Sequence, residues 1–164
     1  MNDNNILAVI LAGGKSKRFG EDKNLAKLGS ISLIEHTIYK IREKFKKILI
    51  IANNDLKVEE FKDIEIIPDH IKGNLGPLVG VLTAMKWAKH SKENYKWIAT
   101  FPSDTPFFDS SIIEKYKKKI IKNDSPLYFV RSDDKRHNIF GLWSLDLLDI
   151  LEKDIVKNNF RKVE

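Results

Sequence analysis

Apolar runs of strand length alternate with amphipathic stretches along almost the whole chain. The runs typical of strands occupy 5–13, 46–54, 64–69, 96–104, 126–131 and 138–145. The polar run 132–137 between the last two indicates a hairpin-like or looped connection. The pattern therefore predicts six strands and shows no internal repeat.

Helical periodicity falls between and after these strands, at 32–45, 76–90, 110–121 and 145–159. At the start of the first helix, Ser32 and Glu35 fit a capping box, in which each side chain satisfies a free backbone N–H group. Ser111 and Glu114 fit a second capping box at the start of the third helix. Four helices are thus predicted, two of them with defined caps.

The alternation of strands and helices predicts one α/β domain that spans residues 1–164. Such an order is typical of a mostly parallel sheet with helices on both faces, which makes three layers. In such sheets ligands bind beyond the carboxyl ends of the strands. That rule predicts one cleft lined by the segments 11–14, 52–54, 68–70 and 102–106.

Composition narrows the classes of protein to consider. Hydrophobic residues make up 42% of the 164 residues, which is enough to build a core. No apolar run approaches the roughly 18 residues that span a bilayer, and the N-terminus lacks the basic region of a signal peptide. With no cysteine there is neither a disulfide framework nor a thiolate metal site, so we expect a cytoplasmic protein.

The net charge of +6 raises the question of an anionic partner. Lysines and arginines are spread along the chain, and the run Lys117–Lys119 lies inside a helical pattern. A solvated helix face explains that run better than a nucleic-acid patch does. We therefore look for a small anionic ligand.

The segment 11–23, LAGGKSKRFGEDK, follows the first strand and combines glycines with cationic side chains. It is not a P-loop, because that motif needs a glycine where this chain has a valine, and it contains no G-x-G-x-x-G. Adjacent Gly13 and Gly14 let backbone N–H groups approach an oxyanion, while Arg18 and Lys23 supply charge. We interpret the segment as a phosphate site; the alternative is a glycine-rich turn whose lysines face solvent.

Two carboxylates at strand ends favour the phosphate site over a plain turn. Asp104 ends the fourth strand pattern, and Pro106 restricts the backbone that follows it. Mg²⁺ usually binds carboxylate and phosphate oxygens together, so Asp104 is a natural ligand for it. Asp69, after the third strand, suits either the metal or a ribose hydroxyl. The alternative for each aspartate is capping of the turn or helix that follows.

The glycine segment resembles the signature of the nucleotidyltransferases with a Rossmann-like fold, and most closely that of the molybdenum cofactor guanylyltransferases. Four further segments follow in the family's order and at similar spacing: SLIEHTI (32–38), GPLVGVL (76–82), FPSDTPF (101–107) and HNIFGLW (137–143). The similarity covers nearly the whole chain. It implies a three-layer Rossmann-like fold and Mg²⁺-dependent transfer of GMP from GTP to the phosphate of molybdopterin, with release of pyrophosphate.

The resemblance also implies roles for individual residues. It assigns catalysis to Arg18, Lys23 and Asp104, with Asp104 as the metal ligand. It assigns nucleotide binding to Leu11, Ala12, Gly13, Gly14, Lys23, Asn53, Asp69 and Asp104. Lys23 is expected at the phosphates and Asn53 near the guanosine, whereas His137 and Asn138, with Arg18, lie where the family receives the pterin.

The partners implied by the resemblance are GTP and molybdopterin, with transient contacts to molybdoenzymes or their chaperones. We expect a monomer that binds neither nucleic acid nor membranes. Ser103 stands where many relatives have cysteine, a change that leaves the metal ligand in place. The chain ends at Glu164, ahead of a further strand and a closing segment found in relatives, so we expect a domain truncated at its C-terminus.

Three other functions remain open on the sequence alone. The first is a cytidylyltransferase for the same pterin, or a nucleotidyltransferase for another small phosphorylated acceptor. The second is a nucleotide-binding protein without catalysis. The third is a basic nucleic-acid binder, which predicts a steep dependence of binding on salt. No aromatic platform or recognition helix supports the third.

Overall fold

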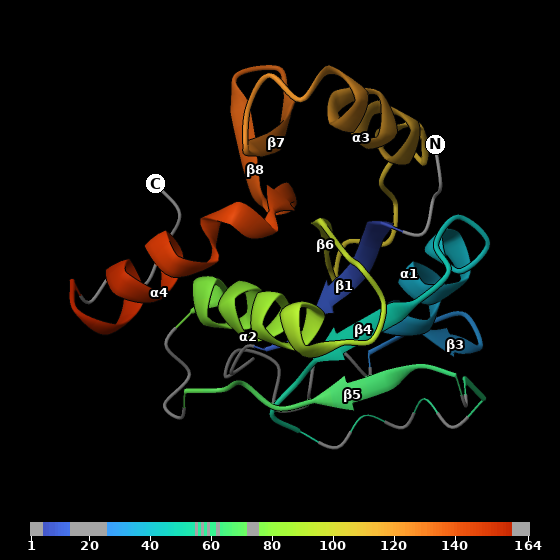
Figure 1. Cartoon of the computed structure of the whole chain (residues 1–164). Helices are drawn as coiled ribbons and strands as arrows, with labels where there is room; N and C mark the ends of the chain where they lie inside the picture. Colours follow the sequence, from blue (N-terminus) through green and yellow to red (C-terminus); the bar gives the residue numbers. More distant parts are fainter. Residues whose placement is uncertain are drawn as a thin grey trace.

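The computed structural model describes residues 5–13, 26–54, 56, 58, 60–61, 63–71 and 76–158. They form a six-stranded sheet in the order β5-β4-β1-β6-β8-β7 (Figure 1). Its strands are β1 (Ile6–Leu11), β4 (Ile48–Ile51), β5 (Glu65–Ile67), β6 (Trp97–Pro102), β7 (Leu127–Ser132) and β8 (Lys135–Ser144). The helices are α1 (Leu33–Ile41), α2 (Pro77–His90), α3 (Ser111–Lys122), the 3₁₀ helix η3 (Leu145–Leu147) and α4 (Leu148–Val156). A separate small hairpin consists of β2 (Lys27–Leu28) and β3 (Ile31–Ser32).

Four neighbouring strands, β5, β4, β1 and β6, run parallel, and β8 and β7 complete the sheet in antiparallel pairs. β1 lies in the middle, with Leu11 beside both Ile51 of β4 and Pro102 of β6. Parallel strands end at a common edge, so the segments that follow them begin side by side. The predicted mostly parallel sheet with helices on both faces is confirmed.

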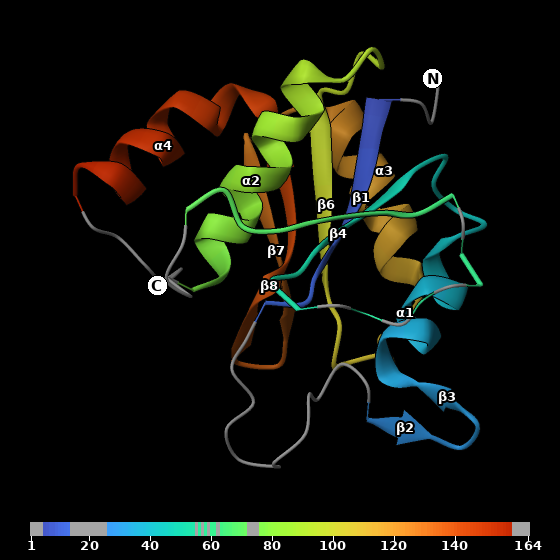
Figure 2. The same cartoon turned by 90° about the horizontal axis from the view of Figure 1, so that it is seen from below.

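The residues of β1 alternate between the two helical layers. Ile6, Ala8 and Ile10 belong to the core on the side of α1 and α3, whereas Leu7 and Val9 belong to the core on the side of α2 and α4. Figure 2 shows the two pairs of helices on opposite sides of the sheet. All six residues of β1 are buried, which explains why the strand has a continuous apolar run instead of an alternating pattern.

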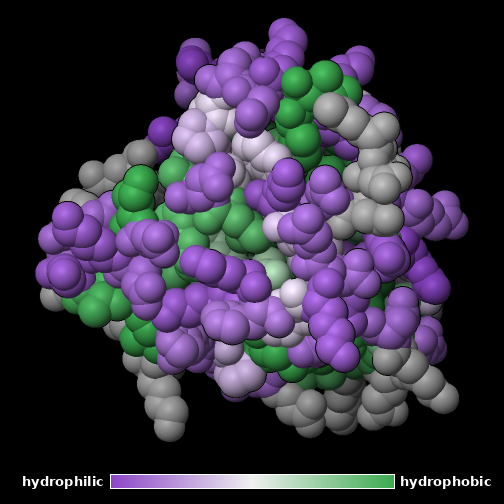
Figure 3. Space-filling model, in the orientation of Figure 1, coloured by the Kyte–Doolittle hydropathy of each residue, from purple (hydrophilic) through white to green (hydrophobic). Residues whose placement is uncertain are grey.

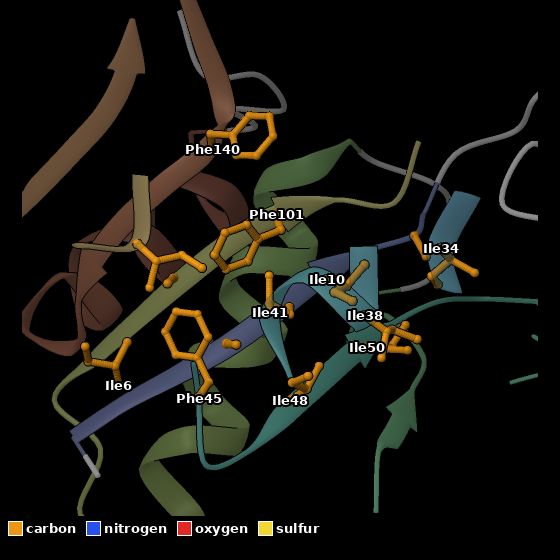
Figure 4. Packing of buried hydrophobic residues seen from close by; sticks show 14 of the residues in the cluster. Ile6, Ile10, Ile34, Ile38, Ile41, Phe45, Ile48, Ile50, Phe101 and Phe140 are labelled. Atoms are coloured by element: carbon orange, nitrogen blue, oxygen red, sulfur yellow. The ribbon is translucent and has the colours of Figure 1, made fainter. Parts of the chain in front are cut away.

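Aromatic rings join β6 to the layer that contains α1 and α3. The ring of Phe101 lies 5.8 Å from that of Phe45 and 6.2 Å from that of Phe140, both in edge-to-face geometry. Ile38 and Ile41 of α1 extend the same cluster along β1 and β4 (Figure 4). This core fixes the carboxyl ends of the central strands, where the candidate site lies.

The two predicted capping boxes have different outcomes. The one at α1 is confirmed: Glu35 N–H donates to Ser32 Oγ at 3.4 Å, and Ser32 N–H donates to Glu35 Oε2 at 2.6 Å. The one at α3 is wrong, because Ser111 is already the first helical residue. Asp109 Oδ1 instead accepts from Ser111 N–H at 2.9 Å, so a carboxylate two residues earlier takes over the role.

The predicted hairpin of the last two strands is confirmed, but β8 begins earlier than its apolar pattern. The polar residues Lys135 and Arg136 already pair with β7, and the register shifts between Phe129 and Val130. β8 runs opposite to β6, with Thr100 beside Gly141, so the first half of β8 lies at the carboxyl edge of the parallel strands. Apolar patterning misses this half because polar side chains cover it.

Hydrophilic residues cover most of the face shown in Figure 3, with smaller apolar areas between them. This agrees with the even spread of lysines and arginines along the sequence. Among the helices of the described ranges, none is both long and apolar enough to cross a membrane.

Candidate active site

The candidate site starts from backbone hydrogen bonds that continue the sheet beyond three parallel strands. Ala12 N–H donates to Ile51 O at 2.9 Å, and Ala52 N–H donates to Ile67 O at 3.0 Å. The ends of β1, β4 and β5 are therefore held together one residue past the strands. The predicted clustering of segments 11–14, 52–54 and 68–70 is observed for their described residues.

Asn53 and Asp69 join the turns that follow β4 and β5. Asn53 Nδ2–H donates to Asp69 Oδ2 at 2.7 Å, and Asp69 N–H donates back to Asn53 Oδ1 at 2.9 Å. Both ends of the Asn53 amide are thus used on one residue, which fixes the amide orientation and the aspartate backbone together. The sequence placed both residues at the site without indicating that they contact each other.

Glycines surround the carboxylate of Asp69. A Cβ on Gly13 would lie 3.6 Å from Asp69 Oδ2, and a Cβ on Gly80 of α2 would lie 3.6 Å from Asp69 Oδ1 and 3.0 Å from Leu11 Cδ2. Burial raises the pKa of Asp69 above its ordinary value, because burial penalises the charged form, and the Asn53 hydrogen bond acts in the opposite direction. The carboxylate is therefore a half-buried acceptor beside the end of β1.

The next residue is tied to helix α2. His70 N–H donates to Thr83 Oγ1 at 2.9 Å, and the hydroxyl of Thr83 donates to Val79 O at 2.8 Å. Thr83 is buried, and its hydroxyl satisfies two backbone groups at once. Two successive backbone N–H groups, at Asp69 and His70, are consequently held by side chains from different elements. Thr83 could not be predicted from the sequence, because nothing in its spacing distinguishes it from the other residues of an amphipathic helix.

Asp104 lies at the same edge, two residues beyond the end of β6. Its side chain is exposed, and Thr105 Oγ1 donates to its Oδ1 at 3.1 Å. Within the described ranges there is no group of three or more His, Cys, Asp or Glu side chains that could hold a metal by itself. A single exposed carboxylate fits Mg²⁺, because this ion usually combines one or two carboxylates with phosphate oxygens and water.

His137 and Asn138 lie in the first half of β8, at the same carboxyl edge. Ser132 Oγ and His137 Nε2 are 2.6 Å apart across the hairpin, and Arg136 Nε–H donates to Asn138 Oδ1 at 2.7 Å. The register shift of the β7–β8 pair falls next to these residues, and such irregularities redirect side chains.

The structure thus brings Leu11, Ala12, Gly13, Asn53 and Asp69 together, with Asp104 further along the same edge. Gly14, Arg18 and Lys23 lie outside the described residues. Among described residues, the arrangement offers backbone and amide groups for a nucleotide and one exposed carboxylate for a cation.

Comparisons with known proteins relate the chain to a family of transferases. Residues 8–163 match the MobA-like NTP transferase domain. The chain is 36% identical over 162 residues to the molybdenum cofactor guanylyltransferase of Haemophilus influenzae, covering 97% of this chain and 81% of that protein. It is 32% identical over 158 residues to the molybdenum cofactor guanylyltransferase of Rhizobium leguminosarum bv. trifolii, covering 96% and 72%.

The fold is also similar to a solved structure. Molybdopterin-guanine dinucleotide biosynthesis protein A from Archaeoglobus fulgidus superimposes with a TM-score of 0.74, at 21% identity, covering 95% of this chain and 75% of that one. The three-layer architecture predicted from the sequence is therefore that of a known group of structures.

Proposed function

The chain belongs to the MobA-like NTP transferase domain family, and from this premise we propose that it transfers GMP from GTP to the phosphate of molybdopterin. Relatives named molybdenum cofactor guanylyltransferase, at 32% and 36% identity, support the choice of guanine and of the pterin. The observation that carries the proposal is the meeting of Gly13, Asn53 and Asp69 at the edge where Asp104 follows β6.

The reaction exchanges one phosphoanhydride bond for another. An oxygen of the pterin phosphate attacks the α-phosphorus of GTP, the bond from that phosphorus to the oxygen bridging to the β-phosphorus breaks, and pyrophosphate leaves with the bond electrons. The attacking phosphate is already an anion, so no strong general base is required. The main task of the protein is to bring two anions together and to stabilise the charge that develops on the leaving group.

The residues of the candidate site have different proposed roles in binding the two substrates and stabilising charge. We assign contact with the nucleoside to Asn53 and Asp69, whose groups are oriented before the ligand binds. We assign backbone contact with the phosphates to Gly13 and Gly14, and the positive charge that faces the phosphates to Lys23 and Arg18.

Asp104 is assigned to the cation. An Mg²⁺ bound there together with the triphosphate supplies Lewis-acid stabilisation of phosphoryl charge. Exposure of Asp104 leaves its carboxylate accessible to such a complex. His137 and Asn138, at the start of β8, are assigned to the pterin side together with Arg18.

The test is turnover with molybdopterin and either GTP or CTP, with the dinucleotide product identified by mass spectrometry. We expect the guanine dinucleotide and one pyrophosphate per product. Faster turnover with CTP contradicts the guanylyl assignment and favours the cytidylyl one. Absence of product with either nucleotide favours a binding protein without catalysis.

A matched pair of variants tests the metal assignment within the same assay. Asp104→Ala is expected to abolish pyrophosphate release above background. Asp149→Ala, which removes an exposed carboxylate on α4, should keep wild-type activity because its partner Lys89 lies in the last turn of α2, whereas Gly80 and Thr83 of the site lie in the first half of that helix. Equal activity of wild type and Asp104→Ala contradicts the role proposed for Asp104.

A further inference from the structure

Lys40 of α1 contacts the loop that follows β6. Its Nζ donates to Pro106 O at 3.0 Å and to Phe108 O at 2.6 Å. The same ammonium lies 4.9 Å from the centre of the Phe108 ring. One half-buried lysine therefore holds two backbone carbonyls that are two residues apart, on a segment more than sixty positions away in sequence.

The position of Lys40 gives no reason to expect these contacts. A lysine in the last turn of a helix ordinarily faces its own C-terminal carbonyls, where the helix dipole favours a positive charge. Here the side chain leaves that location and reaches another segment. Hydrogen bonds from a charged donor are stronger than those between neutral groups, so the loop gains two strong attachments.

The loop held in this way carries Asp104. At its start, Pro102 is paired with β1. At its end, the Phe108 ring is buried at 5.5 Å from Phe101 and 5.2 Å from Phe140. Between these two anchors Pro106 is buried, whereas Asp104 and Thr105 are exposed and the side chain of Phe107 is 73% exposed. The hydrogen bond from Lys40 to Pro106 O adds a charged attachment two residues after Asp104.

We propose that Lys40 is a positioning residue that fixes the Asp104 loop, so that the carboxylate is in place before the metal–triphosphate complex binds. The inference rests on the proposed function, because it takes Asp104 as the metal ligand. Lys40 itself touches neither the metal nor the substrate. Groups that orient a metal ligand from outside commonly change metal affinity by about 10- to 100-fold when they are removed.

The experiment measures binding of Mn²⁺ to the GTP-loaded full chain by electron paramagnetic resonance. Lys40→Met keeps the length of the side chain but removes its donors, and we expect it to weaken Mn²⁺ binding by about tenfold. Lys40→Arg keeps the charge and offers several donors, so it should recover most of the affinity. Lys46→Met is the matched control, since it removes the same charge from an exposed ion pair with Glu93, ahead of the amino end of β4.

A second measurement separates positioning from general damage. Binding of GTP without divalent cations should be equal in wild type and Lys40→Met, because the metal-free nucleotide makes no use of Asp104. Unchanged Mn²⁺ affinity in Lys40→Met overturns the inference, as does an equal loss of metal-free GTP binding or an equal effect of Lys46→Met. Failure of Lys40→Arg to recover affinity also counts against it.

The Asp104→Ala variant distinguishes failure of this inference from failure of the proposed function. If Asp104→Ala weakens Mn²⁺ binding and Lys40→Met does not, only the role of Lys40 is overturned. If Asp104→Ala binds Mn²⁺ like wild type, Asp104 is not the metal ligand, and the metal assignment falls together with the inference.

Discussion

The carboxylate of Asp69 is subject to two opposing influences. Burial raises its pKa above the ordinary value of 3.8, and the hydrogen bond from Asn53 lowers it, with burial the larger cause. A raised pKa in the folded state means that the native protein binds a proton more readily than the unfolded chain. Stability therefore falls as pH rises from the unfolded pKa through the folded one, and the loss persists above that window.

Asp69→Asn removes this titration while keeping a side-chain oxygen that can accept from Asn53. The free energy of unfolding of the variant, relative to wild type, should increase as pH rises through the window that begins at about 3.8. Urea unfolding at a series of pH values measures the difference. Asn53→Ala, which removes the lowering influence, should extend the window to higher pH. If the difference in the free energy of unfolding between Asp69→Asn and wild type is constant with pH, the pKa of Asp69 is not raised in the native state.

Tyr116 presents a different residue-scale problem. Its side chain is buried among core aromatic rings, and within the described part of the chain its hydroxyl has no hydrogen-bond partner. A buried polar group without a partner destabilises the native state. Tyr116→Phe should therefore raise the free energy of unfolding by about 1 kcal/mol near neutral pH, measured by urea unfolding.

The same substitution should also change the response to alkali. Burial raises the pKa of Tyr116, so above about pH 10 the phenol ionises in the unfolded chain before it ionises in the native one. Above about pH 10 the free energy of unfolding of wild type should therefore fall more steeply with pH than that of Tyr116→Phe. A destabilised Tyr116→Phe protein would instead indicate that the hydroxyl has a bound water as its partner.

At the scale of elements, Thr100 connects the parallel half of the sheet to the antiparallel half. Its hydroxyl donates to Ile139 O at 2.6 Å and accepts from Gly141 N–H and from Trp143 Nε1–H, both at 3.1 Å. Ile139 lies where the register of the β7–β8 pair shifts, and Gly141 is the last residue paired in register before the shift. One buried hydroxyl satisfies three groups of β8.

Thr100→Val keeps the shape of the side chain and removes the hydroxyl. Two buried donors lose their acceptor, so the free energy of unfolding should fall by about 2–3 kcal/mol in urea titrations. Thr100→Ser retains the oxygen and should lose less. If Thr100→Val lowers the free energy of unfolding no more than Thr100→Ser does, the hydroxyl does not hold β8 in place.

The elements themselves were largely predictable, and the exceptions have physical causes. Within the described ranges, apolar runs and helical periodicity located the six strands of the large sheet and the four α-helices. The β2–β3 hairpin was missed because strands of two residues are too short for a period. The capping box at Ser111 was wrong because Asp109 competes for the same N–H group, and such competition leaves no trace in a four-residue motif.

The sequence predicted which residues lie at the candidate site better than it predicted the contacts between them. Asn53 and Asp69 could be placed at one edge from the rule for parallel sheets, but their reciprocal hydrogen bonds depend on the side chains of two separate turns. Thr83 and Lys40 act through other residues and carry no motif. Sequence motifs therefore identify residues that contact a ligand. They do not identify the residues that hold those ligand-binding residues in place.

At the scale of the whole molecule, a ligand that binds only the native state must raise its stability. We expect GTP with Mg²⁺ to raise the melting temperature, corresponding to about 2.7 kcal/mol at a concentration one hundred times the dissociation constant. ATP with Mg²⁺ should give a smaller shift, and Asp104→Ala should reduce the effect of the metal. No shift with GTP, CTP or ATP removes the basis for any nucleotide-dependent function.

The central position of β1 also bears on how the protein is made. All of its residues are buried, yet its partner β6 lies more than halfway along the chain, since Ile6 pairs with Trp97. During synthesis the first strand must wait, unpaired on that side, until residues beyond 100 have left the ribosome. Contacts so distant in sequence slow folding, and unpaired apolar strands aggregate. The strand at the centre of the finished sheet is thus a strong candidate for protection by chaperones on the nascent chain.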